Sequence, residues 1–320
     1  MASRGRKFRN CLQLALMLLA SLGASRSAAR AAENDLSQPR FWLVRTYGLG
    51  DPGQAEADVR RLDIQQLRDS RWSRATVDEL AAATAERTTV VYVHGNRGSD
   101  ELAITRGTRL GAVLAARADS PPLQIVIWSW PSGQVLRGRR DFVFKAERTD
   151  TEAWYLAALL RRFEPEAKVS LLGYSYGARV VTGALHWRAG GRFEGRDLPG
   201  DLTTSRYRVA LLAPAVNVDW VAADGSHGEL WAVTDRLLLL YNPCDPALRW
   251  YRLLYRQQRT APLGRHGVAD AWLGDGAARV EQWNVSSAIG RTHDENAFLD
   301  SPWIADQIGD ALLGRSAPAP

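Results

Sequence analysis

The sequence is poor in cysteine and histidine. Its 320 residues hold two cysteines and five histidines, and one of the cysteines, Cys11, lies within the first 31 residues. Cys244 alone cannot close an internal disulfide, so stability must come from an apolar core. The sequence also has no HExxH motif and no closely spaced pair of cysteines, so we expect no metal. Residues 48–53, after the first strand-like run, do match GxGxxG, but this pattern alone is a weak signal, and we expect no dinucleotide cofactor either.

The first 31 residues have the composition of a secretory signal peptide. Four basic residues lead into the apolar stretch 12–20, which is too short to cross a bilayer, and small residues follow it. The pattern Ala29-Arg30-Ala31 predicts cleavage before Ala32, with Ala24 as an earlier alternative. We therefore expect an exported protein, periplasmic or secreted, with no membrane partner in its mature form. An uncleaved membrane anchor is the alternative, because two arginines stand between the apolar stretch and the cleavage site.

The chain has no excess of either charge once this leader is set aside. It has 41 basic and 35 acidic residues, and the leader holds six of the basic ones, which leaves 35 of each. The positive balance thus belongs to targeting, and we expect no nucleic-acid partner. One local basic cluster occurs at 137–140. We interpret it as a solvated loop, because Asp141 follows it and no aromatic residues are interleaved with it.

Apolar, β-branched runs alternate with longer helix-like stretches along the rest of the chain. This order predicts a mostly parallel sheet with helices on both faces, in a single α/β domain over 32–315 that precedes a disordered tail at 316–320. The expected strands are Phe41 to Tyr47, Thr88 to His94, Leu123 to Trp128, Lys168 to Leu172, Tyr207 to Ala213, Arg236 to Tyr241 and Val280 to Val285.

Capping residues mark the expected helix starts. Thr76 begins a capping-box pattern, Asp100 can cap the next helix, and Thr149 or Thr151 can open the one after it. We expect the last helix at about Ile304 to Leu313.

The most informative motif is Gly173-Tyr174-Ser175-Tyr176-Gly177. It follows the apolar run 169–172 and precedes a stretch, 178–185, that can continue as a helix. Glycines two residues before and after a serine are typical of a nucleophile elbow, in which a strand turns sharply into a helix and leaves no room for side chains. We therefore predict that Ser175 is a nucleophile. The alternative is a chance glycine-rich turn.

Around this motif the chain resembles the α/β-hydrolase superfamily from about Phe41 to Leu313. It resembles more closely a bacterial α/β-hydrolase family that is catalogued as a domain of unknown function. The likeness rests on Val93-His94-Gly95-Asn96, Trp128-Ser129-Trp130-Pro131-Ser132-Gly133, the elbow, Ala213-Pro214-Ala215 and the segment from Tyr241 to Leu248. The resemblance implies a three-layer fold and hydrolase chemistry on a serine, an aspartate and a histidine. The chain departs from the family in having Tyr176 where methionine is usual after the serine.

The superfamily resemblance also implies where a tetrahedral oxyanion would be held. The run 89–93 leads into the glycine-bearing turn 94–98, where the superfamily places one backbone donor. We expect the N–H groups of Tyr176 and Asn96 to form the oxyanion hole, with a plain tight turn as the alternative for Asn96. His94 is expected to brace this turn through hydrogen bonds rather than to act as a base.

An acid and then a histidine should follow the serine, each at the carboxyl end of a later strand, as in the superfamily. Asp245 lies in a proline-bracketed loop after the apolar run 237–241 and is our predicted acid. Asp219, after the preceding strand, is its rival. Asp235 precedes its strand and lies at the wrong end of the sheet.

Two histidines, His266 and His293, come after Asp245. His293 follows the last expected strand, whereas His266 precedes it. We therefore predict that His293 takes the proton of Ser175 and returns it to the leaving group, and that Asp245 fixes the imidazole tautomer. A surface histidine is the alternative reading of His293.

The substrate site is expected to be an open cleft with aromatic walls. The intervals 190–207 and 213–235 are too short for a large cap, and Tyr174 and Tyr176 flank the serine. Trp128 or Trp130 is expected to contribute to the wall, with core packing as the alternative. The sequence thus predicts an exported, esterase-like serine hydrolase that acts on a small acyl substrate. A thioesterase, amidase or peptidase on the same residues and a non-catalytic binding protein are the alternatives.

Overall fold

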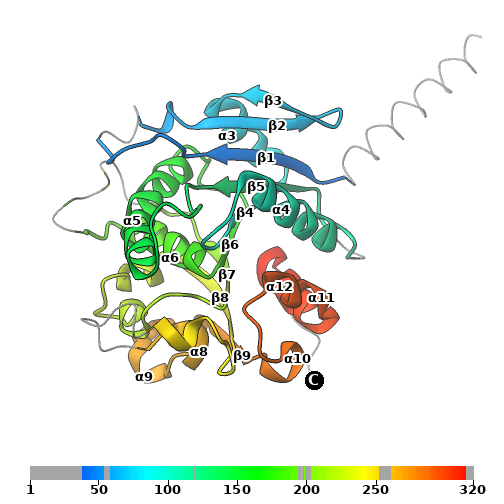
Figure 1. The fold of residues 1–320 in the computed structure, drawn as a ribbon. Coiled ribbons are helices and arrows are strands. Elements are labelled where there is room, and N and C mark those ends of the chain that lie inside the picture. The colour runs from blue at the N-terminus through cyan, green and yellow to red at the C-terminus, as the bar shows by residue number, and fades with distance from the viewer. Residues whose placement is uncertain are drawn as a thin grey trace, which may run out of the picture. The chain divides into compact units, whose positions relative to one another are not determined.

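Nine strands form one sheet in the computed structural model, which describes residues 38–53, 58–117, 120–193, 196, 198, 203–251 and 261–314 (Figure 1). The strands are β1 (Arg40–Arg45), β2 (Asp63–Arg68), β3 (Arg71–Ala75), β4 (Thr88–Val93), β5 (Leu123–Ser129), β6 (Val169–Tyr174), β7 (Tyr207–Leu212), β8 (Thr234–Tyr241) and β9 (Val280–Asn284). Their order is β3-β2-β1-β5-β4-β6-β7-β8-β9. Neighbouring strands from β1 to β9 are parallel, whereas β2 is antiparallel to β1 and β3.

Helices cover both faces of this sheet. Figure 1 shows α5 (Arg139–Leu160) and α6 (Tyr176–Arg188) on one face, and α4 (Asp100–Ala115), α11 (Glu295–Asp300) and α12 (Pro302–Leu313) on the other. The residues of β5 and β6 are consequently all buried. The predicted mostly parallel sheet with helices on both faces is confirmed. The other short elements are α3 (Val77–Glu86), η1 (Val218–Val221), η2 (Gly228–Ala232), η3 (Leu248–Trp250), α8 (Leu263–His266), α9 (Asp270–Leu273), η4 (Gly274–Arg279) and α10 (Ser286–Ile289).

The seven expected strands are all present, but the hairpin of β2 and β3 was not predicted. Its sequences, DIQQLR and RWSRA, are mostly polar because the hairpin lies at the edge of the sheet, where little of its surface is buried. Asp69 and Ser70 join the two strands with φ angles of 48° and 62°, the left-handed backbone that two-residue hairpin turns require.

Helix starts were predicted with mixed success. The capping box at Thr76 is confirmed, and Ser99 rather than Asp100 caps α4. The expected start of α5 at Thr149 or Thr151 was wrong, because this helix begins at Arg139. A buried ion pair stabilises its first turns: Lys145 Nζ lies 2.7 Å from the carboxylate of Asp141, and both residues are almost fully buried.

Two predicted segments lie outside the described residues, namely the signal peptide at 1–31 and the tail at 316–320. Among the helices that the structure does describe, none combines the length and the apolar character needed to cross a membrane.

The elbow at Ser175 brings α6 very close to the ends of two strands. Ser175 has a φ of 52°, so the chain reverses within one residue. A Cβ atom at Gly173 would lie 2.7 Å from Ala178 Cα, and one at Gly177 would lie 2.1 Å from the carbonyl oxygen of Val93. Both contacts are with backbone, which cannot move aside without shifting a strand or a helix. Glycine is therefore required at both positions.

We expect the substitution Gly177→Ala to lower the free energy of unfolding by about 2 kcal/mol, because the added methyl group would overlap the end of β4. Gly50→Ala is the matched control, since no atom lies within 4 Å of a Cβ at that position. It should change the free energy by less than about 0.5 kcal/mol. Urea unfolding followed by circular dichroism measures both variants, and equal midpoints would show that the elbow tolerates a side chain.

Candidate active site

Ser175 lies between the end of β6 and the first turn of α6. Its backbone N–H donates to Leu212 O at 3.0 Å, and its carbonyl oxygen accepts from Ala215 N at 3.1 Å. These bonds tie the elbow to the end of β7 on one side. Ser175 is 6% exposed, and its side chain lines a pocket. The hydroxyl is thus held in place while one side stays accessible from that pocket.

A continuous chain of polar contacts joins Ser175 to Asp245. His293 Nε2 lies 3.0 Å from Ser175 Oγ, and His293 Nδ1 lies 2.6 Å from Asp245 Oδ2. An ionised carboxylate can only accept, so the proton of the neutral imidazole is held on Nδ1. Nε2 then presents its lone pair to the serine hydroxyl.

The carboxylate of Asp245 is fully buried, and both of its oxygens have partners. Oδ2 contacts His293, while Oδ1 accepts from the backbone N–H groups of Ala247 at 2.8 Å and Leu248 at 2.9 Å. These two donors belong to the start of η3. These three donors hold the carboxylate in one orientation against His293.

Asn242, which the sequence did not single out, joins the loop of the acid to the loop of the histidine. This residue is fully buried at the end of β8. Its Nδ2 donates to Gly290 O at 2.8 Å, and its Oδ1 accepts from Cys244 N at 2.9 Å. The signal for it was present in the sequence, since an asparagine directly after an apolar strand often bonds its own turn. Its cross-loop bond, however, appears only in three dimensions.

The side chain of Tyr174 also holds His293 in place. The Tyr174 hydroxyl donates to the carbonyl oxygen of His293, and the two rings pack with their centroids 5.3 Å apart. The guanidinium of Arg106 lies over the Tyr174 ring, 5.7 Å from its centroid. Arg106 Nη1 in turn donates to Glu295 Oε2 at 2.8 Å.

Glu295 is a buried carboxyl group two residues after His293. It is 3% exposed, and burial raises its pKa from 4.5 to about 7, although the charge of Arg106 acts in the opposite direction. It is the first residue of α11, directly after Asp294, whose side chain caps that helix. The Arg106–Glu295 pair therefore fixes α11, and with it the loop that carries His293, against α4.

The turn 94–98 lies against the elbow, as the sequence predicted. A Cβ atom at Gly95 would lie 3.0 Å from Ser175 Cβ, so the backbone that leads into Asn96 passes next to the serine. Tyr176 is the first residue of α6, where helical N–H groups point along the axis out of the helix. The backbones of both expected oxyanion donors thus border the space in front of Ser175.

The buried ring of His94 contacts the backbone of this turn and of Trp130. Its Nδ1 lies 2.8 Å from Gly95 O, and its Nε2 accepts from Trp130 N at 3.3 Å. Burial lowers the pKa of His94 to about 4, so the ring is neutral at pH 7 and can donate from Nδ1 while it accepts at Nε2. This arrangement is that of a brace, and His94 does not line the pocket of Ser175.

The pocket in front of Ser175 has a volume of about 200 Å³ and mostly apolar walls. Expected residues that line it are Asn96, Tyr174, Tyr176 and His293. Residues that the sequence did not single out as its wall are Arg97, Phe142, Ala215, Ala247, Leu248 and Tyr251. Several of these come from loops and short helical turns, which carry no periodic pattern that could have revealed them.

Trp128 and Trp130 do not line this pocket, which corrects the expectation that one of them forms its wall. Both are fully buried. Trp128 Nε1 donates to Glu152 Oε2 at 3.0 Å, and Trp130 Nε1 donates to His94 O at 2.9 Å. Each indole therefore supports the core below the site. Phe142 and Tyr251 supply aromatic walls in their place.

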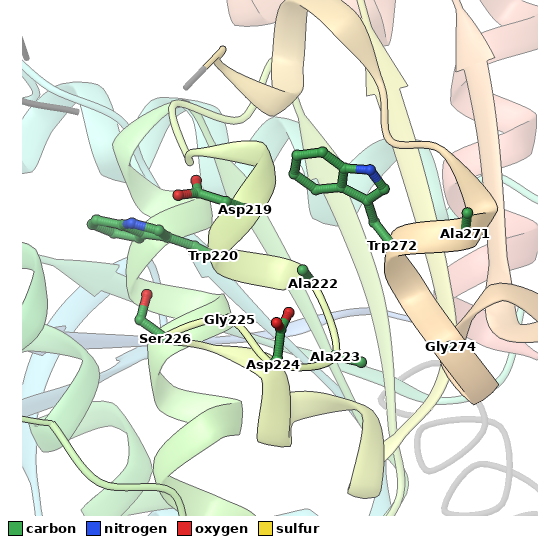
Figure 2. Close-up of a pocket in the computed structure, with 10 residues that line it drawn as sticks. All are labelled: Asp219, Trp220, Ala222, Ala223, Asp224, Gly225, Ser226, Ala271, Trp272 and Gly274. Carbon is green, nitrogen blue, oxygen red and sulfur yellow. The ribbon is translucent and has the colours of Figure 1, made fainter. Parts of the chain in front are cut away.

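The rival residues lie elsewhere. Asp235 pairs with Arg208 at 3.1 Å near the start of β8, and His266 is exposed. Asp219 borders a separate open hollow of about 770 Å³, together with Trp220, Asp224 and Trp272 (Figure 2). No histidine lines that hollow among the described residues. The smaller pocket, where serine, imidazole and carboxylate meet, is therefore the candidate active site.

The family described as an alpha/beta hydrolase of unknown function (DUF900) matches residues 72–287, which is more than half of the chain. The chain belongs to this family. The predicted resemblance to a bacterial α/β-hydrolase family of unknown function is thereby confirmed. The matched range of this DUF900 protein includes Ser175 and Asp245, and it ends shortly before His293. No curated protein matches the chain.

Several solved structures are similar to this DUF900 protein at low sequence identity. Acyl-protein thioesterase 2 from Zea mays is 17% identical, with a TM-score of 0.40 over 71% of this chain and 94% of its own. Esterase B from Lactobacillus rhamnosis is 14% identical, with a TM-score of 0.40 over 95% and 96%. Esterase 2 from Thermogutta terrifontis is 13% identical, with a TM-score of 0.37 over 73% and 86%. Because these TM-scores are below 0.5, the assignment of the chain to an α/β-hydrolase family rests on the family match over residues 72–287.

The raised pKa of Glu295 predicts a pH-dependent contribution to stability. In the unfolded chain this carboxyl ionises near pH 4.5, but in the folded protein it ionises near pH 7. The folded state therefore binds more protons between these values, and the free energy of unfolding should fall as the pH rises from about 4.5 to about 7. The slope contributed by this one group is at most about 1.4 kcal/mol per pH unit.

The substitution Glu295→Gln should remove this contribution, because the amide does not ionise. Urea unfolding of both proteins across this range should show the advantage of the parent over the variant shrinking with rising pH. Glu101→Gln, on the exposed face of the first turn of α4, serves as the control and should leave the profile unchanged. Parallel profiles for the parent and Glu295→Gln would contradict the assignment of a raised pKa to this carboxyl.

Proposed function

We propose that the protein is a serine hydrolase that cleaves acyl esters through a covalent acyl-enzyme. One observation carries this proposal: Ser175 Oγ, His293 and Asp245 form an uninterrupted chain with contacts of 3.0 Å and 2.6 Å, and Ser175 and His293 line a pocket. The buried, doubly supported carboxylate and the fixed imidazole are what the activation of a serine requires.

In the first half of the reaction, Ser175 Oγ attacks the carbonyl carbon of the ester. His293 Nε2 accepts the hydroxyl proton, and Asp245 stabilises the imidazolium that forms. The carbonyl oxygen becomes negatively charged and is held by the backbone N–H groups of Tyr176 and Asn96. When the tetrahedral intermediate collapses, His293 gives its proton to the departing alcohol, and the acyl group stays on Ser175.

In the second half, a water molecule repeats these steps. His293 removes a proton from the water, which attacks the acyl-enzyme, and the same two N–H groups hold the second oxyanion. The proton then returns to Ser175 Oγ as the carboxylic acid leaves. Ser175, His293 and Asp245 are regenerated, and one water molecule is consumed for each ester cleaved.

The shape of the pocket favours the acyl part of the substrate over the alcohol part. A volume of about 200 Å³ is smaller than the roughly 300–1,000 Å³ typical of pockets that enclose drug-sized ligands. Ala215, Leu248 and Tyr251 offer apolar contacts to the first carbons of an acyl chain. The rest of the substrate must then extend beyond the mouth. A thioester would satisfy the same geometry, and the discriminating comparison is between an ester and a thioester of one acyl group.

We expect a fluorophosphonate probe to label the parent protein, because phosphonylation requires an activated serine but assumes no substrate. Ser175→Ala should not label, and its hydrolysis of p-nitrophenyl butyrate should fall by about ten-thousandfold or more. His293→Gln should slow labelling to a similar degree. His266→Gln is the matched control, since this exposed histidine lies outside the site, and it should label at the parental rate.

Asp245→Asn should likewise reduce ester hydrolysis by about a thousandfold or more, and Asp219→Asn should reduce it far less. Folded parent protein that neither labels nor hydrolyses the ester would contradict the proposal and would favour a binding protein with a hydrolase fold.

A further inference from the structure

Exposed arginines gather around the mouth of the Ser175 pocket. Arg97 lines the pocket itself, and its guanidinium lies 5.2 Å from the ring centroid of Phe142, another lining residue. Arg249 follows Leu248, which also lines the pocket, and it packs over the ring of Trp250 at 5.7 Å. Two separate segments that line the pocket therefore each carry an exposed basic residue.

The basic loop 131–140 is fastened beside this opening at both ends. Near its start, Ser132 O accepts from Arg97 N at 2.8 Å, and Ser132 Oγ accepts from Gly98 N at 2.9 Å. Near its end, Asp141 Oδ1 accepts two backbone N–H groups of the loop, at 2.8 Å each, and Asp141 directly precedes Phe142. The loop is thus held between the turn 94–98 and Phe142, which lines the pocket.

Four exposed arginines near the mouth, namely Arg97, Arg137, Arg140 and Arg249, form no ion pair within the described residues. Elsewhere the chain pairs arginines with carboxylates, as at Arg45, Arg106, Arg117 and Arg236. In the described segments that border the pocket, the exposed carboxylate is Asp294, and it caps α11. An uncompensated positive field of this kind attracts an anionic partner.

Apolar side chains stand among these arginines and point into solvent. Val135 is 64% exposed, Leu136 is 39% exposed and Trp250 is 56% exposed. A soluble anion would gain nothing from these three side chains. A lipid layer would gain from them. Its anionic headgroups would contact the arginines, Val135 and Leu136 would insert between headgroups and acyl chains, and Trp250 would lie at the membrane–water interface.

We propose that this surface binds an anionic lipid layer, from which the pocket draws its ester. We define the rim as Val135, Leu136, Arg137, Arg140, Arg249 and Trp250. The inference rests on the proposed function for the ester, but binding of the layer by the rim does not depend on catalysis. It replaces the interpretation of 137–140 as a merely solvated loop and the expectation that the mature form has no membrane partner. It also explains where the part of the substrate that does not fit the pocket would lie.

The test uses vesicle co-sedimentation of the full chain carrying Ser175→Ala, so that binding is measured without turnover. Vesicles of phosphatidylcholine with about 30% phosphatidylglycerol should bind the protein, and vesicles of phosphatidylcholine alone should bind it far less. Raising the salt from about 50 mM to about 500 mM should weaken the binding several-fold. Adding Arg137→Gln and Arg140→Gln should lower the partition coefficient about twentyfold.

Arg71→Gln with Arg74→Gln is the matched control, because it removes the same charge from two exposed arginines on β3, at the edge of the sheet. It should change binding less than twofold. Val135→Ser with Leu136→Ser tests the apolar part and should lower binding about tenfold at unchanged charge. Thermal unfolding of each variant verifies that it is folded.

Three outcomes would overturn the inference: no binding to anionic vesicles, equal loss from the rim and control arginine pairs, or equal binding to neutral and anionic vesicles. Fluorophosphonate labelling of the parent reports on the proposed function separately. A protein that binds vesicles but fails to label would refute the hydrolase and support the rim. A protein that labels but does not bind would refute the rim alone.

Discussion

The reversal of the backbone at Ser175 is the constraint on which the rest of the site depends. A φ of 52° at a serine is a conformation that L residues avoid, at a cost of about 1–3 kcal/mol. It persists because α6 can approach β4 only where Gly177 has no side chain. The same approach places the first N–H of α6 beside the serine and brings the turn at Gly95 into contact with it. One strained residue therefore fixes the nucleophile and both backbones expected to hold an oxyanion.

The acid and the base reach the serine from loops, so they need a different kind of support. Asp245 follows β8, and His293 lies between α10 and α11, beyond the edge strand β9. Three partly buried polar contacts replace the rigidity that a strand would give: Asn242 to Gly290 O, Tyr174 to His293 O, and Arg106 to Glu295. Each one joins elements that are distant in sequence. The imidazole is consequently oriented by the core as much as by its carboxylate.

The sequence predicted the sheet, the elbow and the three residues that meet in the pocket because each of them has a local signal. Buried parallel strands are apolar throughout, the elbow needs its glycines, and an aspartate or histidine that follows such a strand lies at one known edge. The failures have equally physical causes. The β2–β3 hairpin is polar because it lies at an edge, and α5 starts early because a buried Asp141–Lys145 pair stabilises turns that look solvated. Trp128 was assigned to the pocket because its burial depends on a tertiary partner, Glu152, that no local pattern reveals.

The carboxylates near His293 and the arginines near the pocket mouth differ in burial and in pairing. Two carboxylates near the imidazole, Asp245 and Glu295, are buried and partnered, whereas Asp294 is exposed and caps α11. Arg97, Arg137, Arg140 and Arg249 are exposed, and among the described residues they form no ion pair. The positive potential of these arginines favours anions at the mouth, although residues 32–320 have equal numbers of basic and acidic residues. A small apolar pocket can distinguish acyl groups only weakly, by about 1–3 kcal/mol per methylene. Under the proposed function, selection among esters would consequently depend on the surface that presents them.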